Sequence, residues 1–397
     1  MTIDREQFMK DGYLILRNVV PPDQLESLRG SLERMVEKRR ELSRQRRTPD
    51  QPPGGEWEAA AQPRLNFAID CDEQSAGPIE FLLGETTLGV CRQLMDAEDV
   101  SPHYFACSCN AESRDFGPAA WHRDIGPGDP APLSGMIANQ VHHGPSYLQW
   151  NIALYEDSVF WIVPRSHLRT NTDEENRQLA DDPRSPLPGG IPVELGPGDG
   201  VVYTYLLLHW GSNYTRKLRR TIHPGYRPFG FASLPNVHWR HWEPGFFQYL
   251  SPEARRQLEK WDALFLNEMD QFAGIFRALI ERDAGEFLSR LEHLHPSPHA
   301  RSVTLAMLNQ VSLKLHRLKH TGAPASAVWG NGRDMTWLGS HFTADETELI
   351  RQRFAALDAR LRLPEPVENP SFQRSNSAYL ANQMPEDLTV EGFVASW

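Results

Sequence analysis

The stretch LGPGDGVVYTYLLLHWGSN, residues 195–213, decides the fold that we predict for this chain. Its first residues, rich in glycine and proline, are typical of a tight turn. The apolar run that follows is typical of a buried strand, and this strand ends at His209. Four other stretches have the same texture and are separated by turn residues: HYFACSCN (103–110), YLQWNIAL (147–154), SVFWIVP (158–164) and RRTIHPGYR (219–227). Many short strands at this spacing predict a β-sandwich or a β-barrel.

Helical patterns flank this β-rich middle on both sides. Near the amino terminus, residues 22–36 carry leucines and a valine at helical spacing. After about residue 245, longer apolar stripes follow the same spacing, and Thr343 with Glu346 forms a capping-box signature. We therefore expect a mainly β core with a helical amino-terminal support and a helical carboxy-terminal extension.

The change in texture predicts three parts of the chain. The β-rich domain covers residues 1–240, the helical region covers 241–363, and a polar arm covers 364–397. The apolar stripes of the helical region need a partner surface. We therefore expect this region either to cap the mouth of the barrel or to form a homodimer interface.

Composition and charge exclude several classes of partner. The chain has 397 residues, of which 40% are hydrophobic and 23% are charged, as in ordinary globular proteins. A net charge of -11 opposes nucleic-acid binding. The amino terminus lacks the pattern of a secretory signal, and the longest apolar run, 201–208, is too short to span a membrane. The cysteines fit a reducing compartment as small apolar core groups: Cys71, Cys91, Cys107 and Cys109. We expect a cytoplasmic protein without nucleic-acid or membrane partners.

The segment WHRD, residues 121–124, suggests a metal site. In an extended chain, His122 and Asp124 project from the same face, so both side chains can reach one ion. His209 would supply a third ligand if its strand ran beside this segment. Two imidazoles and one carboxylate on one face of an octahedron leave three positions open, which suits non-haem iron(II) oxygenases.

The segment RKLRRTIH, residues 216–223, supplies candidate arginines on the following strand. An inward-pointing arginine can hold the far end of a small dicarboxylate by two parallel hydrogen bonds. Arg219 and Arg220 point to opposite faces of a strand, so only one of them can do this. Arg216 is the third candidate in the segment.

Residues 8–230 resemble the phytanoyl-CoA dioxygenase family of Fe(II)/2-oxoglutarate oxygenases. The matching pieces, in order, are DGYLILRNVVPPDQLESLR, WHRD, WNIALYEDSVFWIVPRSH, LGPGDGVVYTYLLLHWGSN and RRTIHPGYR. The resemblance implies a double-stranded β-helix, a jelly-roll barrel of the cupin type. It does not cover the helical region.

The resemblance also implies roles for individual residues. It implies three iron ligands: His122, Asp124 and His209. Alignment on Asn213 selects Arg219 as the residue that grips 2-oxoglutarate, and the register of the WNIAL strand selects Asn151 as an inward residue near the co-substrate. The family's Pro-Gly-Ser-His turn reads PRSH at 164–167, so the glycine that tolerates a left-handed turn is missing.

The expected activity is that of a dioxygenase that uses Fe(II), 2-oxoglutarate and O2. It would hydroxylate a small molecule, such as an acyl thioester, an amino-acid derivative or a natural product, and release succinate and CO2. Desaturation, ring closure or epoxidation would use the same residues. Related enzymes that halogenate replace the carboxylate ligand with a small residue, so the presence of Asp124 opposes halogenation.

Two alternatives come from other classes of function. The first is a non-catalytic jelly-roll module that binds a small molecule or a partner protein. The second is a metal-dependent hydrolase, because zinc also accepts two histidines and one aspartate. The first leaves a complete ligand set without a use, and the second leaves the aligned arginine without one.

The remaining histidine clusters are expected to be structural. His142 and His143 lie in the segment between the first two ligands and residue 150, where we expect surface histidines near the active-site mouth. His293, His295 and His299 resemble a metal tract in composition, but their context predicts a helix end that runs into prolines.

Overall fold

The computed structural model describes residues 3–125, 131–230, 244–295, 297–322, 332–368, 377–380 and 384–397. Two of its β-sheets make up the predicted β core. The main sheet has the order β1 (Tyr13–Leu16), β8 (Gly200–Thr204), β5 (Leu148–Ala153), β10 (Arg220–Ile222), β4 (Ala106–Cys109) and β2 (Arg64–Asn66), with β11 (Gly225–Pro228) joining β5 to β3 (Val100–Tyr104). The second sheet has the order β7 (Ile191–Pro192), β6 (Phe160–Ile162) and β9 (His209–Gly211).

Neighbouring strands in both sheets run antiparallel. The antiparallel sheets, with helices before and after them in the chain, confirm the expected fold class: a mainly β core with a helical amino-terminal support and a helical carboxy-terminal extension. Side chains alternate between the two faces of each strand. On β5, Trp150 and Ile152 belong to the core beneath the amino-terminal helices. Ala153 and its strand neighbours face the second sheet, where they pack with Phe160 and Ile162 of β6.

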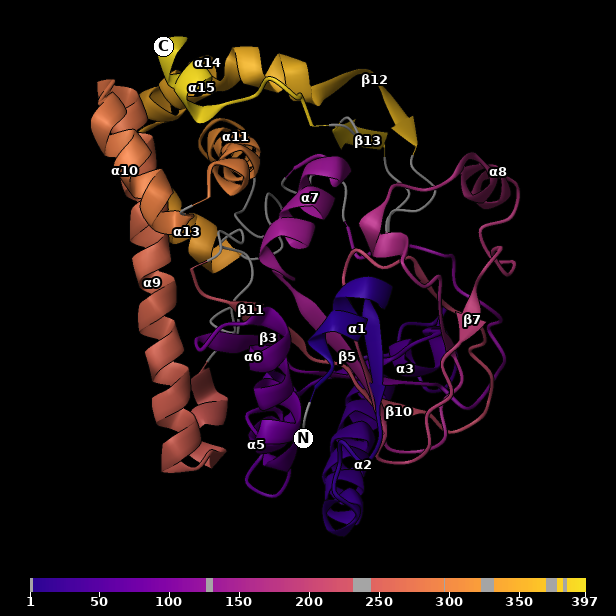
Figure 1. Cartoon of the computed structure of the whole chain (residues 1–397). Coiled ribbons are helices and arrows are strands. Elements are labelled where there is room, and N and C mark those ends of the chain that lie inside the picture. The colour runs from indigo at the N-terminus through magenta and orange to yellow at the C-terminus, as the bar shows by residue number, and fades with distance from the viewer. Residues whose placement is uncertain are drawn as a thin grey trace.

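The amino-terminal helices cover the outer face of the main sheet (Figure 1). They are α1 (Arg5–Asp11), α2 (Pro22–Gln45), α3 (Glu56–Ala59), α4 (Phe67–Asp70), α5 (Gly77–Leu82) and α6 (Val90–Met95). In this core Leu28 and Leu32 of α2 are buried, at the helical spacing seen in the sequence. The Trp150 indole N–H donates to the sulfur of Cys91, which ties β5 to α6.

Two further helices lie in the connections of the barrel. They are α7 (Leu133–His143) and α8 (Asp173–Asp181). Helix α8 begins with a capping box, in which Thr172 and Glu175 bond to each other's backbone N–H. Helix α7 is part of the segment that follows Asp124, and its residues Leu133 and Met136 are buried against the carboxy-terminal helices.

The carboxy-terminal extension is helical, as expected. Its helices are α9 (Pro252–Glu281), α10 (Ala284–Leu294), α11 (Pro298–His320), α13 (Gly332–Ser340), α14 (Ala344–Leu361) and α15 (Val390–Ala395), and β12 (Arg362–Glu368) pairs with β13 (Ser377–Leu380). Figure 1 shows α9 along one side of the molecule and α11 beside α7. Within the described ranges, no helix combines the length and apolar character needed to cross a membrane.

Two features join the helical region to the β core. One apolar cluster contains Leu206, which follows β8, together with residues of α7 and of the helices from α9 onward. A buried ion pair joins Arg227 of β11 to Glu268 of α9, with Nη2 2.7 Å from both carboxylate oxygens. Near the chain end, Val390 and Phe393 are buried in the same apolar cluster, so this part of the predicted polar arm packs against the helices.

Candidate functional site

The three predicted ligands come together where the segment 121–124 lies against β9. His122 and His209 form an isolated antiparallel bridge, with both N–H···O=C distances at 2.9 Å. The backbone N–H of Asp124 donates to the carbonyl of Tyr205, at 3.1 Å. One ligand atom from each of the three side chains lies within 4.8 Å of the other two. The segment of His122 therefore does run beside the strand of His209, as the sequence analysis assumed.

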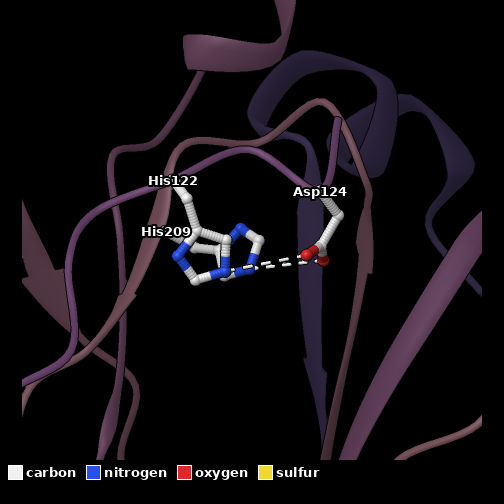
Figure 2. Close-up of side chains that lie close together, drawn as sticks. All are labelled: His122, Asp124 and His209. Atoms are coloured by element: carbon white, nitrogen blue, oxygen red, sulfur yellow. Dashed lines mark ion pairs between the residues drawn. The ribbon is translucent and has the colours of Figure 1, made fainter. Parts of the chain in front are cut away.

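The two imidazoles direct their Nε2 atoms toward one carboxylate (Figure 2). His122 Nε2 lies 3.6 Å from Asp124 Oδ1, and His209 Nε2 lies 3.4 Å from Oδ2. Each Nδ1 lies 2.8 Å from a backbone carbonyl two residues earlier in the chain, at Ala120 and Leu207. Because a carbonyl can only accept, each Nδ1 donates to it, and this bond fixes each ring so that its Nε2 faces the carboxylate. In metal sites, a hydrogen bond from the other ring nitrogen to a backbone carbonyl commonly fixes the orientation of the histidine.

The protonation states of the cluster suit a cation. Burial, together with the neighbouring His209, lowers the pKa of His122 to about 4. Burial alone would raise the pKa of Asp124, but His209 and His122 hold it well below its ordinary value. At neutral pH the site therefore presents a neutral imidazole at His122 and a carboxylate at Asp124, the forms that coordinate metal ions.

The register of the main sheet places Arg219 on the side that faces the second sheet. Thr221 of β10 pairs with Ala153, which faces that side, and Arg219 has the same parity as Thr221. The Arg219 Nε donates to Asp157 Oδ2 at 2.8 Å. Its buried Nη1 has no hydrogen-bond partner among the residues that the structure describes. Arg220 points the other way, to the carboxylates of Glu33 and Glu112 outside the sheet.

Asn151 lies on the same inner face, because it is two residues before Ala153 on β5. Its Oδ1 lies 2.8 Å from His223 Nδ1, which also lies 2.7 Å from the carbonyl of Trp150. The carbonyl acceptor assigns the proton to Nδ1 and leaves Nε2 of His223 as an acceptor. Burial, with a contribution from Arg64, lowers the pKa of His223 to about 4.

His223 and Arg64 are inner-face residues that the sequence analysis did not single out. His223 lies four residues after Arg219, so the two-residue period of the strand could have marked it. Arg64 pairs with Ser108, and Ser108 pairs with Thr221, which places Arg64 on the inner face too. The Arg64 side chain is exposed and lies 3.3 Å from the Tyr104 hydroxyl. No sequence signal marked it, because it belongs to a three-residue strand.

Arg64 brings a second positive charge toward the cluster. Desolvation by the surrounding protein would lower the pKa of Arg64, but interactions with Tyr104, Asp124 and Tyr214 raise it above its ordinary value. The inner face therefore carries two cationic side chains, the exposed Arg64 and the buried Arg219, in addition to the His/Asp cluster. Such an interior favours anionic molecules.

The turn at residues 164–167 has an arginine, Arg165, where the family has glycine, and this residue has a positive φ. Arg165 has φ 67° and ψ 2°, so it adopts the left-handed conformation that glycine adopts without strain. The turn supports the site, because the Ser166 hydroxyl accepts from the backbone N–H of Leu208, next to His209. The buried Arg123, between the two ligands of its segment, donates to the carbonyl of Ser166 at 2.8 Å.

The two histidine groups that we expected to be structural are not part of the His122/Asp124/His209 cluster. His142 is exposed at the end of α7, and the half-buried His143 stacks edge-on against His295, with centroids 5.2 Å apart. His293 lies in the last turn of α10 and His295 follows that helix. The side chain of His299 lies outside the described residues.

The comparison with protein families covers more than half of the chain. Residues 8–221 match the model of the phytanoyl-CoA dioxygenase family, PhyH. The chain belongs to this family. The PhyH match begins at the predicted residue and ends within β10, so the helical region lies outside it. Membership confirms the suspected family and makes the chain an oxygenase of the Fe(II)/2-oxoglutarate-dependent class, with Fe(II), 2-oxoglutarate and O2 as its cofactors.

Several solved structures resemble this PhyH chain at low sequence identity. AviO1 from Streptomyces viridochromogenes Tue57 is 24% identical, with a TM-score of 0.40 over 57% of this chain and 96% of that chain. EctD from S. alaskensis, crystallised with 2-oxoglutarate and 5-hydroxyectoine, is 17% identical, with a TM-score of 0.41 over 56% and 74%. The 2-oxoglutarate-dependent epimerase SnoN of nogalamycin biosynthesis is 15% identical, with a TM-score of 0.39 over 56% and 80%. No curated protein matches the sequence.

Proposed function

We propose that this protein hydroxylates a small molecule, with His122, Asp124 and His209 holding the iron. The observation that carries the proposal is the convergence of two imidazole nitrogens and one carboxylate oxygen, each within 4.8 Å of the other two. The donor set fits iron(II), because two imidazoles and one carboxylate on one face leave three positions for co-substrate and O2. When bound, the iron and 2-oxoglutarate supply the oxidising chemistry, with release of succinate and CO2.

Arg219 is the proposed partner of the far carboxylate of 2-oxoglutarate. Its buried Nη1 finds no hydrogen-bond partner in the described part of the chain, and a carboxylate oxygen would supply one. Asp157 holds Nε at 2.8 Å and so orients the guanidinium. Burial would lower the pKa of Arg219, but Asp157 and Tyr214 raise it, so the group stays charged. The outward ion pairs of Arg220 support the choice of Arg219 over its neighbour.

Asn151 is proposed to support the co-substrate pocket through His223. The hydrogen bond from His223 Nδ1 to Asn151 Oδ1 holds the imidazole in one tautomer. Its Nε2 can then accept a hydrogen bond from a polar group of the co-substrate or substrate. The substrate classes remain those expected from the sequence: an acyl thioester, an amino-acid derivative or a natural product.

We further propose that the region 241–363 caps the barrel and that the chain divides at about residue 240. The shared apolar cluster of α7, Leu206 and the carboxy-terminal helices supports a cap rather than a separate unit. Helix α7 belongs to the segment that follows Asp124, so the cap covers a connection next to the proposed metal site. A homodimer interface on the outer side of the helices is compatible with this arrangement.

The first experiment is an anaerobic titration of the protein with Fe(II) and 2-oxoglutarate. The proposal predicts a visible metal-to-ligand charge-transfer band, lost in His122→Ala, Asp124→Ala and His209→Ala. Arg219→Ala should need at least about tenfold more 2-oxoglutarate for the same band. The matched control is Arg216→Ala, an exposed arginine of the same segment, which should titrate like the wild type.

The alternatives make different predictions for the same titration. Tight metal binding without the band, and without consumption of 2-oxoglutarate, would favour a metal-dependent hydrolase. Failure of the wild type to bind metal would favour a non-catalytic binding module.

A further inference from the structure

A second cluster of metal-ligand side chains lies on the helical region. His316 and His320 lie one turn apart on α11, and Glu348 lies on α14. One ligand atom from each lies within 4.8 Å of the other two. The imidazole rings stack at 4.1 Å with an interplanar angle of 21°. This cluster belongs to the part of the chain beyond the family match, which ends at residue 221.

We propose that His316, His320 and Glu348 form a second metal site, which binds a divalent transition ion of the zinc type. Histidines at positions i and i+4 share one face of a helix, so two imidazoles can reach one ion. Imidazole nitrogens favour Zn(II), Ni(II) and Cu(II) over Mg(II) and Ca(II), which prefer oxygen ligands. Glu348 adds one negative charge, and water completes the coordination because the side chains are exposed or half-buried.

The ligands are carried by two helices that are already fixed against each other. Asn309 of α11 donates to Asp358 of α14 at 2.9 Å in the buried interface. Arg351 of α14 donates to Asn309 Oδ1 at 2.9 Å and to Ser312 at 2.7 Å. Since this interface holds the backbones, little ordering of the chain is needed when an ion binds, which favours affinity.

The hydrogen bonds in the cluster show what an ion would replace. His316 Nε2 lies 2.8 Å from Glu348 Oε2, and His320 Nε2 lies 3.1 Å from the carbonyl of Ala344. An ion bound at these Nε2 atoms would replace the N–H of each bond, and the ring proton would then lie on Nδ1. Because protons compete with the ion for imidazole and carboxylate, binding should weaken as the pH falls.

The proposed role of this ion is to join α11 to α14. An ion that binds the folded chain and not the unfolded chain raises the free energy of unfolding, by an amount that grows with the logarithm of its free concentration. The site would stabilise the region that covers the barrel, without contact with the residues of the oxygenase site. The inference therefore stands independently of the proposed hydroxylase function.

The test counts Zn(II) equivalents bound by the metal-free, full-length protein in isothermal titration calorimetry. We expect two equivalents for the wild type, one at each cluster. His316→Ala/His320→Ala should lose one equivalent and keep the Fe(II)/2-oxoglutarate band. Asp124→Ala should weaken Zn(II) binding at the His122/Asp124/His209 cluster. Loss of a residue that only hydrogen-bonds to a metal ligand lowers metal affinity by about 10–100-fold. Because Glu348 is itself a proposed ligand, Glu348→Gln should weaken Zn(II) binding at the helical site by more than about tenfold.

The matched control is His293→Ala, an exposed histidine on α10, which should bind as the wild type does. Thermal unfolding of the metal-free variants should match the wild type, because the substituted side chains are exposed or half-buried. An equal number of equivalents in the wild type and in His316→Ala/His320→Ala would overturn the site. Loss of the charge-transfer band alone would overturn the oxygenase proposal and leave this site intact.

Discussion

Arg219 and Asp157 form a buried ion pair, with Nε 2.8 Å from Oδ2 and both side chains less than a tenth exposed. Asp157 also accepts from the hydroxyl of Thr221 and the backbone N–H of Val159. Burial would raise the pKa of Asp157, but Arg219 and Thr221 lower it, so the pair is charged at neutral pH. The aspartate thus stabilises a cation on the inner face, beside the space where a co-substrate carboxylate would bind.

Removal of Asp157 should destabilise the fold strongly. Asp157→Ala leaves the Arg219 charge buried without its partner, and breaking a buried pair from one side costs about 3–5 kcal/mol. Urea unfolding measures this loss. Glu156→Ala, next in the chain and paired only with exposed Lys217, should cost less than about 1 kcal/mol. If 2-oxoglutarate binds Arg219, adding it should recover part of the stability of Asp157→Ala; no recovery would argue against that contact.

Arg123 should act as a positioning residue for the metal ligands on either side of it. It is fully buried and donates to the carbonyls of Ser166 and Leu206. Arg123→Met removes these bonds and should weaken Fe(II) binding by about 10–100-fold, as loss of outer partners does. The measurement is the Fe(II) concentration that half-saturates the charge-transfer band. Unchanged iron affinity, together with lowered stability, would limit Arg123 to a structural role.

Replacement of Arg165 by glycine should stabilise the protein. Arg165 is exposed, at φ 67°, and its side chain makes no hydrogen bond to the residues that the structure describes. The left-handed conformation costs a non-glycine residue about 1–2 kcal/mol, so Arg165→Gly should raise the free energy of unfolding by about 1 kcal/mol. Arg165→Ala is the control that keeps the strain and should show no such gain. Equal effects of the two substitutions would show that the arginine side chain, and not the backbone, sets the stability.

Stability should fall in mild acid partly because of His167. Burial lowers the pKa of His167 from 6.5 in the unfolded chain to about 4. Between these values the unfolded chain binds more protons, so this contribution is full above about pH 6.5 and is lost as the pH falls toward 4, by up to about 3 kcal/mol. Urea unfolding at a series of pH values measures the slope. In His167→Gln the slope over this window should be smaller; an unchanged slope would assign it to other groups.

Much of the barrel and of the metal cluster was predictable from local sequence. The His-x-Asp spacing of His122 and Asp124 places both side chains on one side of an extended chain, which depends only on backbone geometry. The buried strand that leads to His209 is marked by its apolar run and by the turn before it. The helices of the carboxy-terminal region were predicted in the same way, from apolar residues at helical spacing.

The strand pattern alone left open the choice between Arg219 and Arg220, which only the family resemblance had made in favour of Arg219. The alternation of side chains says that they face opposite ways, but only the pairing of β10 with β5 decides which one faces the second sheet. The same pairing brings His223 to Asn151. Arg64 reached the inner face through a three-residue strand that has no pattern of its own.

The proposed metal site of His316, His320 and Glu348 shows the same division most clearly. The sequence alone determines that His316 and His320 share a helix face, because the helical repeat is local. Glu348 reaches them only because α11 and α14 pack at one register, set by buried contacts such as Asn309 with Asp358. By itself, then, the sequence determined strands, helices and the chemistry of each ligand, which follow from neighbours along the chain. The tertiary structure decided which distant side chains meet, because packing between elements depends on the whole core.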